Sequence, residues 1–529
     1  MFLIMSGAYV GQELESEFGR IPPSFLPLGN RRLFQHQVAL APKGLQIYLS
    51  LPESFDISPI DQAWLDENKI EVVPIPDGLS LGASLVAAVN ISGHRLDKPL
   101  HVLYGDTLFQ QLPVGDDVVS ISLAKYSYNW AVLTDDHCEW LKDHQPQKTR
   151  ETTRIIDGYF KFSQPKTILK CITQSEWNFI QGLNRYHQAV GLTPVYSSGW
   201  LDFGHVNTYY RSKAKFTTQR AFNELVITPH WIEKSSSHNN KISAEAEWFT
   251  KLPAPLRGYT PQFLGCETSR DGKISYRLEY LHNTALNELF VFSRLPLPSW
   301  QSILKNCIDF LVECYNTKAP NEAESNSMDI LFGIKTEQRI KEYCQNTDLD
   351  PSSCWVFNGE PSVSLKKILQ DSHDNLPDCS PHASVLHGDF CFSNILYDFR
   401  AEKIKIIDPR GMTPEGKKTL YGDIRYDIAK LSHSVLGLYD WIVAGYYQVD
   451  THENNIFLSI AEPAEHKELQ QGFVEMIKHH FGLEAQHLYA MQIQLFLSML
   501  PLHEDDPKRQ QAFFANAFRL HQIMTRVKQ

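Results

Sequence analysis

The sequence predicts an α/β protein of two domains, and three observations lead to this prediction. The chain has 529 residues, which is too long for one ordinary hydrophobic core. In its first half, short apolar runs alternate with segments of helical periodicity, as in βαβ units around a mostly parallel sheet. In its second half, two short apolar runs that end in polar residues, within residues 387–411, predict a strand–loop–strand stretch with acidic side chains.

The composition and the charge exclude several classes of protein. The net charge is −11 and no long run of lysine or arginine occurs, so we expect no nucleic-acid partner. The nine cysteines are scattered without a C-x-x-C pair, which favours free thiols in a reducing compartment over disulfides or a zinc site. Residues 1–5 are too short for a signal peptide, and no stretch approaches the roughly 20 apolar residues of a spanning helix. We therefore expect a cytoplasmic protein without membrane insertion.

Four apolar runs in the first half are predicted to be strands: residues 2–5, 44–49, 70–75 and 100–104. In an open α/β sheet the ligand crevice lies at the carboxyl ends of the strands. The last of these runs is followed directly by Gly105, Asp106 and Thr107. Asp106 is therefore expected to lie where the chemistry takes place.

Five motifs in the first half are similar, in the same order, to motifs of the sugar-1-phosphate nucleotidylyltransferases. They are residues 26–33 (LPLGNRRL), 76–83 (PDGLSLGA), 105–106 (GD), 157–163 (DGYFKFS) and 200–205 (WLDFGH). This resemblance covers roughly the first 200 residues and implies a GT-A-like mixed sheet with helices. It also implies a nucleobase-recognition loop that includes Gly78, Leu79 and Gly82. A magnesium site formed by Asp106 and Asp202 is implied as well.

The chemistry of that family explains why two acids are needed. A sugar phosphate oxygen attacks the α-phosphorus of a nucleoside triphosphate, and pyrophosphate leaves. Asp106 and Asp202, on separate loops, would hold the Mg²⁺ that neutralises the developing charge. His205 stands where the family usually has threonine. The alternative is that each aspartate is a helix cap or a turn residue.

Two cations of the family's triphosphate site are missing from this sequence. Glu13 stands near the usual arginine, and Ser24 stands at the usual lysine. Losing two cations costs several charge-assisted hydrogen bonds to the phosphates. Arg20, Arg31 or Arg32 could supply the positive charge from nearby. Two interpretations stay open: a rearranged phosphate site, or a domain that binds nucleotide or sugar phosphate without transferring a nucleotidyl group.

The second half contains the residues of a phosphoryl-transfer site, within residues 387–396 (HGDFCFSNIL) and 406–411 (IIDPRG). The spacing Asp-x-x-x-x-Asn, followed by an Asp beyond a hairpin, is that of a kinase catalytic loop. Asp389 would accept the proton of the attacking hydroxyl, and Asn394 and Asp408 would hold the Mg²⁺ that bridges the nucleotide phosphates. The glycine between His and Asp resembles the aminoglycoside phosphotransferase and choline kinase family, which implies a bilobal, protein-kinase-like fold.

The segment before this stretch contains candidates for the ATP-binding lysine and its acidic partner. Lys234 ends a predicted strand and is the best candidate for contact with the α- and β-phosphates. Residues 242–252 are predicted to be helical and contain Glu245 and Glu247. Glu247 fits best as the acid that pairs with Lys234. The alternative is an exposed lysine and glutamate without that role.

Residues 421–430 (YGDIRYDIAK) resemble the helix start that follows the catalytic hairpin in the phosphotransferase family. There Asp427 would brace the catalytic loop, and the alternative is an ordinary acid at a helix N-terminus. The rest of the chain, to Gln529, is predicted to be helical. In that family such helices form the acceptor pocket, and their residues here are too generic to identify the acceptor.

Together these features predict a nucleotidylyltransferase-like domain at residues 1–218 and a small-molecule kinase at 219–529, with an N-lobe at about 219–285 and a C-lobe at about 286–529. The expected function is bifunctional: MgATP phosphorylates a sugar or polyol, and the product is coupled to an NMP from a second NTP. The resulting NDP-sugar or NDP-polyol would serve surface (capsular) polysaccharide synthesis. The alternative is a kinase with a catalytically inactive ligand-binding domain. The NTP, the acceptor and assembly into a homo-oligomer are left open.

Overall fold

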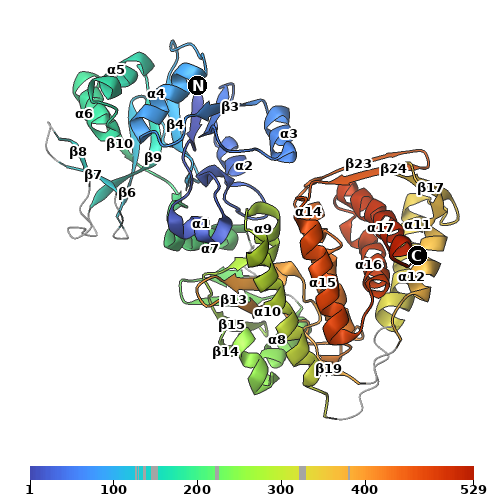
Figure 1. Cartoon of the computed structure of the whole chain (residues 1–529). Coiled ribbons are helices and arrows are strands. Elements are labelled where there is room, and N and C mark those ends of the chain that lie inside the picture. The colour runs from blue at the N-terminus through green and yellow to red at the C-terminus, as the bar shows by residue number, and fades with distance from the viewer. Residues whose placement is uncertain are drawn as a thin grey trace. The chain divides into compact units, whose positions relative to one another are not determined.

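The computed structural model describes residues 1–124, 128, 130–134, 139–143, 153–220, 225–236, 238–320, 329–378 and 382–528. By its internal contacts the chain divides into two compact units (Figure 1). The first comprises Met1–Lys213 and Phe292–Arg294, and the second comprises Ala214–Val291 and Leu295–Gln529. The domain boundary expected after residue 218 stays a prediction.

The first unit is built on a mixed sheet, whose described strands follow the order β10-β6-β9-β4-β1-β2-β3, with a β7–β8 hairpin beside β9. Strands β1 to β4 pair in parallel, whereas β9 runs antiparallel to both β4 and β6. The strands are β1 (Phe2–Met5), β2 (Ile47–Pro52), β3 (Ile70–Ile75), β4 (Leu100–Tyr104), β6 (Val118–Leu123), β7 (Ala131–Leu133), β8 (Leu141–Asp143), β9 (Arg154–Phe162) and β10 (Thr193–Tyr196). The four predicted strands are therefore confirmed as β1 to β4, and their carboxyl ends meet at one edge of the sheet.

Helices cover this sheet and complete the core of the first unit. They are α1 (Gln12–Phe18), α2 (Leu33–Val38), α3 (Pro59–Glu67), α4 (Leu81–Ile91), α5 (Pro165–Gln174), α6 (Phe179–Ala189) and the first part of α7 (Val206–Arg220), which continues past Lys213 into the second unit. Ser80 caps α4 by accepting the N–H of Ala83 at 3.3 Å. Leu85 of α4 packs in one cluster with Leu3 and Val102 of the central strands, all of them fully buried. Because the central strands are buried on both faces, they are continuous apolar runs in the sequence.

The second unit begins with an antiparallel sheet in the order β12-β13-β15-β14. Its strands are β12 (Leu225–Ile227), β13 (Trp231–Ser235), β14 (Phe263–Thr268) and β15 (Ile274–Glu279). Helix α8 (Asn239–Lys251) packs on this sheet through Phe249, whose ring lies 6.0 Å from that of Tyr276. The indole N–H of Trp248 donates to the carbonyl of Leu386 at 2.9 Å, so α8 also contacts the strand that leads to residue 387.

The rest of the second unit is mainly helical. Its helices are α9 (Leu286–Phe292), α10 (Leu297–Asn316), α11 (Lys335–Thr347), α12 (Leu365–Asp374), α13 (Arg425–Val435), α14 (Tyr439–Val443), α15 (His466–Phe481), α16 (Ala485–Met499) and α17 (Pro507–Lys528). Buried apolar side chains of α16 and α17, such as Phe496 and Phe513, form the centre of its core. Among the described residues, no helix is long and apolar enough to cross a membrane.

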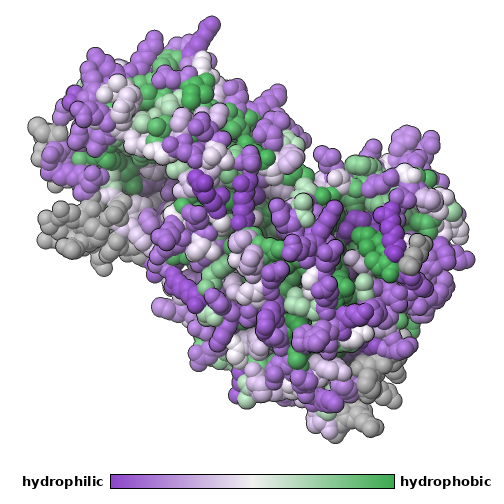
Figure 2. All heavy atoms as spheres, viewed as in Figure 1, coloured by the Kyte–Doolittle hydropathy of each residue, from purple (hydrophilic) through white to green (hydrophobic). Residues whose placement is uncertain are grey.

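Short strands within this helical part hold its loops. They are β16 (Thr284–Ala285), β17 (Cys354–Phe357), β18 (Val363–Ser364), β19 (Ser384–Val385), β20 (Ile395–Asp398), β21 (Lys403–Ile406), β22 (Tyr421–Gly422), β23 (Tyr447–His452) and β24 (Asn455–Ile460). The β20–β21 hairpin lies within the predicted strand–loop–strand stretch, but its strands are shorter than predicted, and residues 387–394 and 407–411 are loops and turns that flank it. The α/β fold class is confirmed, with a mixed sheet and helices followed by a sheet lobe and a helical lobe. Figure 2 shows that hydrophilic side chains cover most of the visible surface of each unit.

Candidate active sites

Strand pairing brings the two predicted metal-binding aspartates of the first unit together. Asp106 follows β4 and directly precedes β5 (Thr107–Leu108), which pairs antiparallel with β11 (Leu201–Asp202). Thr107 lies opposite Asp202 in this register, and the N–H of Phe203 donates to the carbonyl of Asp106 at 2.8 Å. Two residues almost a hundred positions apart in sequence therefore lie side by side at the carboxyl edge of the sheet.

Gly204 shows how closely the two carboxylates approach one point. A Cβ atom added at Gly204 would lie 2.6 Å from Oδ2 of Asp106 and 3.3 Å from Oδ1 of Asp202. Burial and then repulsion by Asp202 raise the pKa of Asp106 to about 7. Such a pair is stabilised by a divalent cation, and carboxylate oxygens are the ligands that Mg²⁺ prefers. The donor set of Asp106 and Asp202 thus fits the predicted metal.

His205 adds an aromatic and basic group to this pair. Its Nδ1 lies 3.4 Å from Oδ2 of Asp202, and its ring stacks on Tyr128 with centroids 3.9 Å apart. Burial lowers the pKa of His205, but the hydrogen bond and the charge of Asp202 outweigh burial and raise it. In the sequence His205 was notable only as a replacement for threonine. The structure indicates that it supplies positive charge beside the acids when it is protonated.

Arg20 is the predicted cation that lies beside the predicted nucleobase loop. Its guanidinium lies 4.0 Å above the ring of Tyr9 and 3.4 Å from the carboxylate of Asp77, which directly precedes Gly78. The Arg20 side chain is 60% exposed, so a ligand can reach it. Gly78 is exposed as well and has a φ of +78°, a conformation that favours glycine.

Other predicted nucleotide contacts lie elsewhere in the first unit. Arg32 is corrected by the structure: it is buried, and its Nη1 donates to the carbonyl of Phe25 at 2.9 Å while Nη2 lies 3.4 Å from Asp61. The side chain therefore stabilises the fold of this unit, because a buried guanidinium needs such partners. Arg31 is exposed, and its role stays a prediction.

Two members of the predicted nucleobase loop are partly or fully buried. Gly82 lies within α4, and a Cβ atom there would be 2.3 Å from the carbonyl oxygen of Trp177. Glycine at this position is explained by close packing of α4, which corrects its assignment as a base contact. Leu79 is half-buried against the hydrophobic core.

The two departures from the family pattern are also visible in the structure. Ser24 is fully buried, and its backbone N–H donates to Oγ of Ser6 at 3.0 Å. Glu13 is exposed in the first turn of α1. Neither position offers a cation to a triphosphate.

In the second unit, Lys234 joins two acidic residues that are far apart in sequence. Its Nζ lies 2.9 Å from Oε2 of Glu245 and 3.0 Å from Oδ1 of Asp408. Tyr276 donates its hydroxyl to the same Glu245 oxygen at 2.8 Å. Burial lowers the pKa of Lys234, but the charges of Asp408 and Glu245 outweigh burial and raise it. Lys234 is therefore a cation fixed between the helix α8 acid and the residue that follows the β20–β21 hairpin.

The predicted pairing of Lys234 with Glu247 is corrected by the structure. Glu247 pairs instead with Lys251 and, at 3.4 Å, with Lys418. Glu245, in contrast, is 1% exposed. Helical periodicity in the sequence indicates that Glu245 is the buried glutamate, because it lies three residues after Ile242 on the apolar side of the helix.

Asp427 holds the catalytic loop in place through two consecutive backbone N–H groups. Its Oδ2 accepts the N–H of His387 at 2.6 Å, and its Oδ1 accepts that of Gly388 at 2.9 Å. Gly388 has a φ of +82°, and a Cβ atom there would be 2.7 Å from Cβ of Arg410. The glycine is therefore required both by backbone conformation and by space. The predicted bracing role of Asp427 agrees with these contacts.

His387 has a defined tautomer within this loop. Its Nδ1 accepts the N–H of Asp389 at 3.3 Å, so Nε2 carries the proton and donates to the carbonyl of Ile407 at 2.9 Å. Burial lowers the pKa of His387 to about 4, which keeps the ring neutral. His387 thus links the loop before β20 to the residue next to Asp408.

The three predicted residues of phosphoryl transfer lie in one loop and hairpin. Nδ2 of Asn394 donates to the carbonyl of Asp389 at 2.9 Å and to its Oδ2 at 3.2 Å, which positions the amide oxygen of Asn394 as the atom that could ligate a metal. The N–H of Ile407 donates to the carbonyl of Asn394 at 3.0 Å, so the hairpin brings Asp408 beside this loop. Asp408 has a φ of +57°, a costly conformation that occurs often at functional sites.

Lys430 is a member of this site that the sequence interpretation missed. Its Nζ lies 2.9 Å from Oδ1 of Asp389. Burial raises the pKa of Asp389, but the charges of Lys430 and Arg410 outweigh burial and lower it well below the usual range. The spacing of Lys430, three residues after Asp427 in the same helix, was the signal that could have identified it.

Both candidate metal sites offer few protein ligands. Among the described residues, no group of three or more His, Cys, Asp or Glu side chains could hold a metal ion. Asp106 with Asp202, and Asn394 with Asp408, each supply two side chains. Mg²⁺ usually keeps several waters and is bound by one or two carboxylates plus substrate phosphates, so these sparse donor sets fit a metal that arrives with a nucleotide.

A scan against protein-family models finds no match, and a search of curated proteins finds none either. The search of solved structures matches a nucleoside-diphosphate-sugar pyrophosphorylase from Vibrio cholerae at 11% identity, covering 40% of this chain and 99% of that one, with a TM-score of 0.33.

The same search matches two aminoglycoside phosphotransferases. A thermostable mutant of APH(4)-Ia matches at 12% identity, covering 59% of this chain and 98% of that one, with a TM-score of 0.35. APH(3'')-Id from Streptomyces rimosus matches at 11% identity, covering 55% and 86%, with a TM-score of 0.31. The two enzyme classes that the sequence motifs resemble thus recur among these matches, at identities and TM-scores that do not establish membership of a family.

Proposed function

We propose that the chain is a bifunctional enzyme: an ATP-dependent phosphotransferase with an alcohol acceptor, joined to a nucleotidyltransferase. The second unit would phosphorylate a sugar or polyol, and the first would couple the phosphate product to an NMP from a second NTP. The activated NDP-sugar or NDP-polyol would serve surface polysaccharide synthesis in the cytoplasm. The observation that carries the proposal is the ion-pair network around Lys234 and Asp389 in the second unit.

In the kinase step, the residues of this chain would bind and orient the reactants. Asp389 accepts the proton of the acceptor hydroxyl as that oxygen attacks the γ-phosphorus of ATP, and the bond from the γ-phosphorus to ADP breaks. Lys234, positioned by Glu245, binds the nucleotide phosphates. Asn394 and Asp408 would hold Mg²⁺, which neutralises phosphate charge when it is bound.

In the nucleotidyl step, Asp106 and Asp202 would hold a second Mg²⁺, and Arg20 would supply positive charge. An oxygen of the sugar phosphate attacks the α-phosphorus, and pyrophosphate leaves. The close approach of the two carboxylates at Gly204 supports a metal-dependent function for this pair.

An Asp408→Ala variant of the full chain tests the kinase assignment. We expect it to lose Mg²⁺-dependent ATP binding, measured by calorimetry, while its circular dichroism spectrum stays that of the wild type. Because Asp408 also pairs with Lys234, binding of ATP in EDTA is the control, and it should change much less than binding of MgATP. Unchanged MgATP affinity would show that Asp408 is an ordinary loop acid.

The second candidate function is a kinase whose first unit only binds a ligand. The buried Ser24 and the exposed Glu13 favour it, because neither replaces the missing cations. Pyrophosphate release from each of the four NTPs, with the kinase's own product as co-substrate, separates the two candidates. Release with any NTP supports the transferase, and no release with any of them supports the binding domain.

A further inference from the structure

A group of cations lies beside the proposed catalytic base of the second unit. Phe332, one turn before α11, packs on Tyr426 with ring centroids 5.7 Å apart. The hydroxyl of Tyr426 accepts a hydrogen bond from Nη2 of Arg410 at 3.3 Å, and the N–H of Arg410 donates to the carbonyl of His387 at 2.8 Å. A continuous series of contacts therefore links the start of α11 to the catalytic loop.

Helix α11, which begins three residues after Phe332, contains two further cations, Lys335 and Arg339. Lys335 and Arg339 are one turn apart, at positions i and i+4, so both lie on one side of the helix. Arg339 uses Nη1 to donate to the carbonyl of Ser498 at 2.8 Å. Within the described part of the chain, the side chain of Lys335 forms neither a hydrogen bond nor an ion pair. It is half-buried and therefore has lost part of its hydration without gaining an acidic partner.

Among the described residues, the charges that shift the pKa of Lys335 are all positive. Burial first, and then repulsion by Arg339, Arg410 and Lys430, lower the pKa of Lys335 to about 8. Lys430 is in turn the partner of Asp389 at 2.9 Å. The cation cluster, defined as Lys335, Arg339, Arg410 and Lys430, holds four basic side chains near Asp389, and the charges of Asp427 and Glu342 also act on its two arginines. A region of surplus positive charge attracts and orients anionic ligands.

We propose that the acceptor of the kinase carries a negatively charged group, a carboxylate or a phosphate, which Lys335 and Arg339 bind while its hydroxyl meets Asp389. This inference rests on the proposed kinase function and specifies its substrate class. The charged group pairs with Lys335, which has no acidic partner among the described residues, and the guanidinium of Arg339 adds planar donors. The cluster also disfavours cationic acceptors, because a positive group would be repelled there.

The chemical step stays that of an ordinary phosphoryl transfer. The acceptor oxygen forms a bond to the γ-phosphorus of ATP, its proton passes to Asp389, and the bond between the γ-phosphorus and ADP breaks. Lys335 and Arg339 take no part in this exchange. They are specificity residues, whose effect is on which acceptors bind.

Matched pairs of acceptors test the proposal on the full-length chain. Each pair contains a neutral compound and an anionic counterpart of the same carbon skeleton: glucose with glucuronate, galactose with galacturonate, glycerol with glycerate, and ribose with ribose 5-phosphate. ADP formation gives kcat/KM for each acceptor, and calorimetry in MgADP gives its affinity. We expect the anionic member to be preferred by about 10-fold or more in at least one pair, the scale of one charge-assisted contact. The carboxylate and phosphate pairs show which anion is used.

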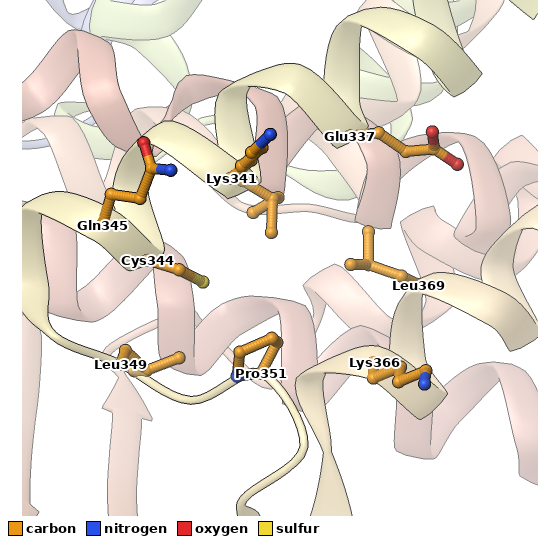
Figure 3. A pocket seen from close by; sticks show the side chains of 9 residues that line it. Glu337, Lys341, Cys344, Gln345, Leu349, Pro351, Lys366 and Leu369 are labelled. Atoms are coloured by element: carbon orange, nitrogen blue, oxygen red, sulfur yellow. The ribbon is translucent and has the colours of Figure 1, made fainter.

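Variants of α11 test whether Lys335 determines the preference for anionic acceptors. Lys335→Met should remove the preference for the anionic member and leave the KM for ATP unchanged. Lys335→Arg should keep the preference for the anionic member as well as the KM for ATP. Lys341→Met is the matched control, because Lys341 lies on the same helix at the wall of a mainly apolar cavity of about 410 Å³ between α11 and α12 (Figure 3). We expect this control to behave as the wild type.

Three results would overturn the proposal. The first is a preference for neutral or cationic acceptors in the wild type. The second is a Lys335→Met variant with a raised KM for ATP and an unchanged acceptor preference, which would assign the cluster to the nucleotide. The third is that the wild type binds none of the anionic acceptors more tightly than the Lys335→Met variant does. Failure of the kinase function itself is separate, because MgATP would then not bind in the absence of any acceptor.

Discussion

Nζ of Lys430 lies 2.9 Å from Oδ1 of Asp389, so the proposed general base is one half of an ion pair. The side chain of Lys430 is only 14% exposed, and water therefore screens the attraction weakly. The pair keeps Asp389 ionised, as a proton acceptor must be, and it also makes the carboxylate a weaker base.

Replacing Lys430 should change the pH dependence of phosphoryl transfer. Lys430 and Arg410 lower the pKa of Asp389 against the effect of burial, so Lys430→Met should raise that pKa. Since only the ionised carboxylate accepts a proton, activity is lost as the pH falls through the pKa. The acidic limb of the kcat/KM profile should therefore move to higher pH in Lys430→Met and much less in Lys430→Arg. A lower rate with an unmoved limb would contradict this role.

Asp389→Asn should retain ATP binding and lower phosphoryl transfer by about 100-fold or more, the usual contribution of a positioned acid–base group. The amide is similar in size but does not accept the proton. Binding is measured by calorimetry and turnover by ADP formation with the true acceptor. Near-normal turnover would exclude Asp389 as the base.

The two glutamates of α8 form a matched pair of variants. Glu245→Gln should lower kcat/KM for ATP by about 10-fold or more, because Lys234 loses the buried acid that positions it. Glu247→Gln changes a partly exposed pair with Lys251 and Lys418 and should stay close to the wild type. Equal effects of the two changes would argue against the position of Glu245 in the nucleotide site.

Asp106→Asn and Asp202→Asn should each remove pyrophosphate release without affecting ADP formation by the kinase. Each amide lacks the charge that a shared Mg²⁺ requires. Pyrophosphate release is measured with each NTP, and the kinase assay on the same preparation controls for folding. Transferase activity that survives both changes would show that the two acids hold no essential metal.

Asp440, at the start of α14, predicts a pH dependence of stability. Burial raises its pKa to about 7, and its Oδ2 has no hydrogen-bond partner among the described residues. A carboxyl with a raised folded-state pKa lowers stability once the pH exceeds its unfolded pKa, and the full cost is reached above the folded pKa. The free energy of unfolding of wild type should therefore fall relative to that of Asp440→Asn by about 2–3 kcal/mol between pH 5 and pH 8. Urea denaturation at several pH values measures this difference, and parallel pH curves would refute it.

The sequence predicted the elements whose residues follow a strict local rule. The parallel strands are continuous apolar runs, and Asp389, Asn394 and Asp408 have the spacing of one loop and one hairpin. Interaction partners that are determined by tertiary packing are not predicted by such local patterns. Glu247 and Glu245 are the same residue type two positions apart, and only the buried side of α8 selects Glu245. Arg32 has the charge of a phosphate ligand, but a buried neighbour, Asp61, binds it instead.

Residues contributed by distant elements could not be paired from sequence alone. Lys430 meets Asp389 because Asp427, on the same helix, accepts the two backbone N–H groups that precede the base. Phe332, three residues before Lys335, packs on Tyr426, and this contact brings the start of α11 beside the same region. These contacts depend on how the helices pack against one another, so the spacing of residues along the sequence does not predict them.

The register of the β20–β21 hairpin determines where residues can be inserted or deleted without moving Asp408. Four residue pairs, from Ile395 opposite Ile406 to Asp398 opposite Lys403, align Asn394 with the residue before Asp408. Side chains alternate between the two faces of a strand, so inserting or deleting one residue within β21 would turn Asp408 to the opposite face. The turn at residues 399–402 lies outside the paired residues and can change in length while the ladder keeps its alignment. Related chains should therefore vary in length at this turn and be invariant in length along the two strands.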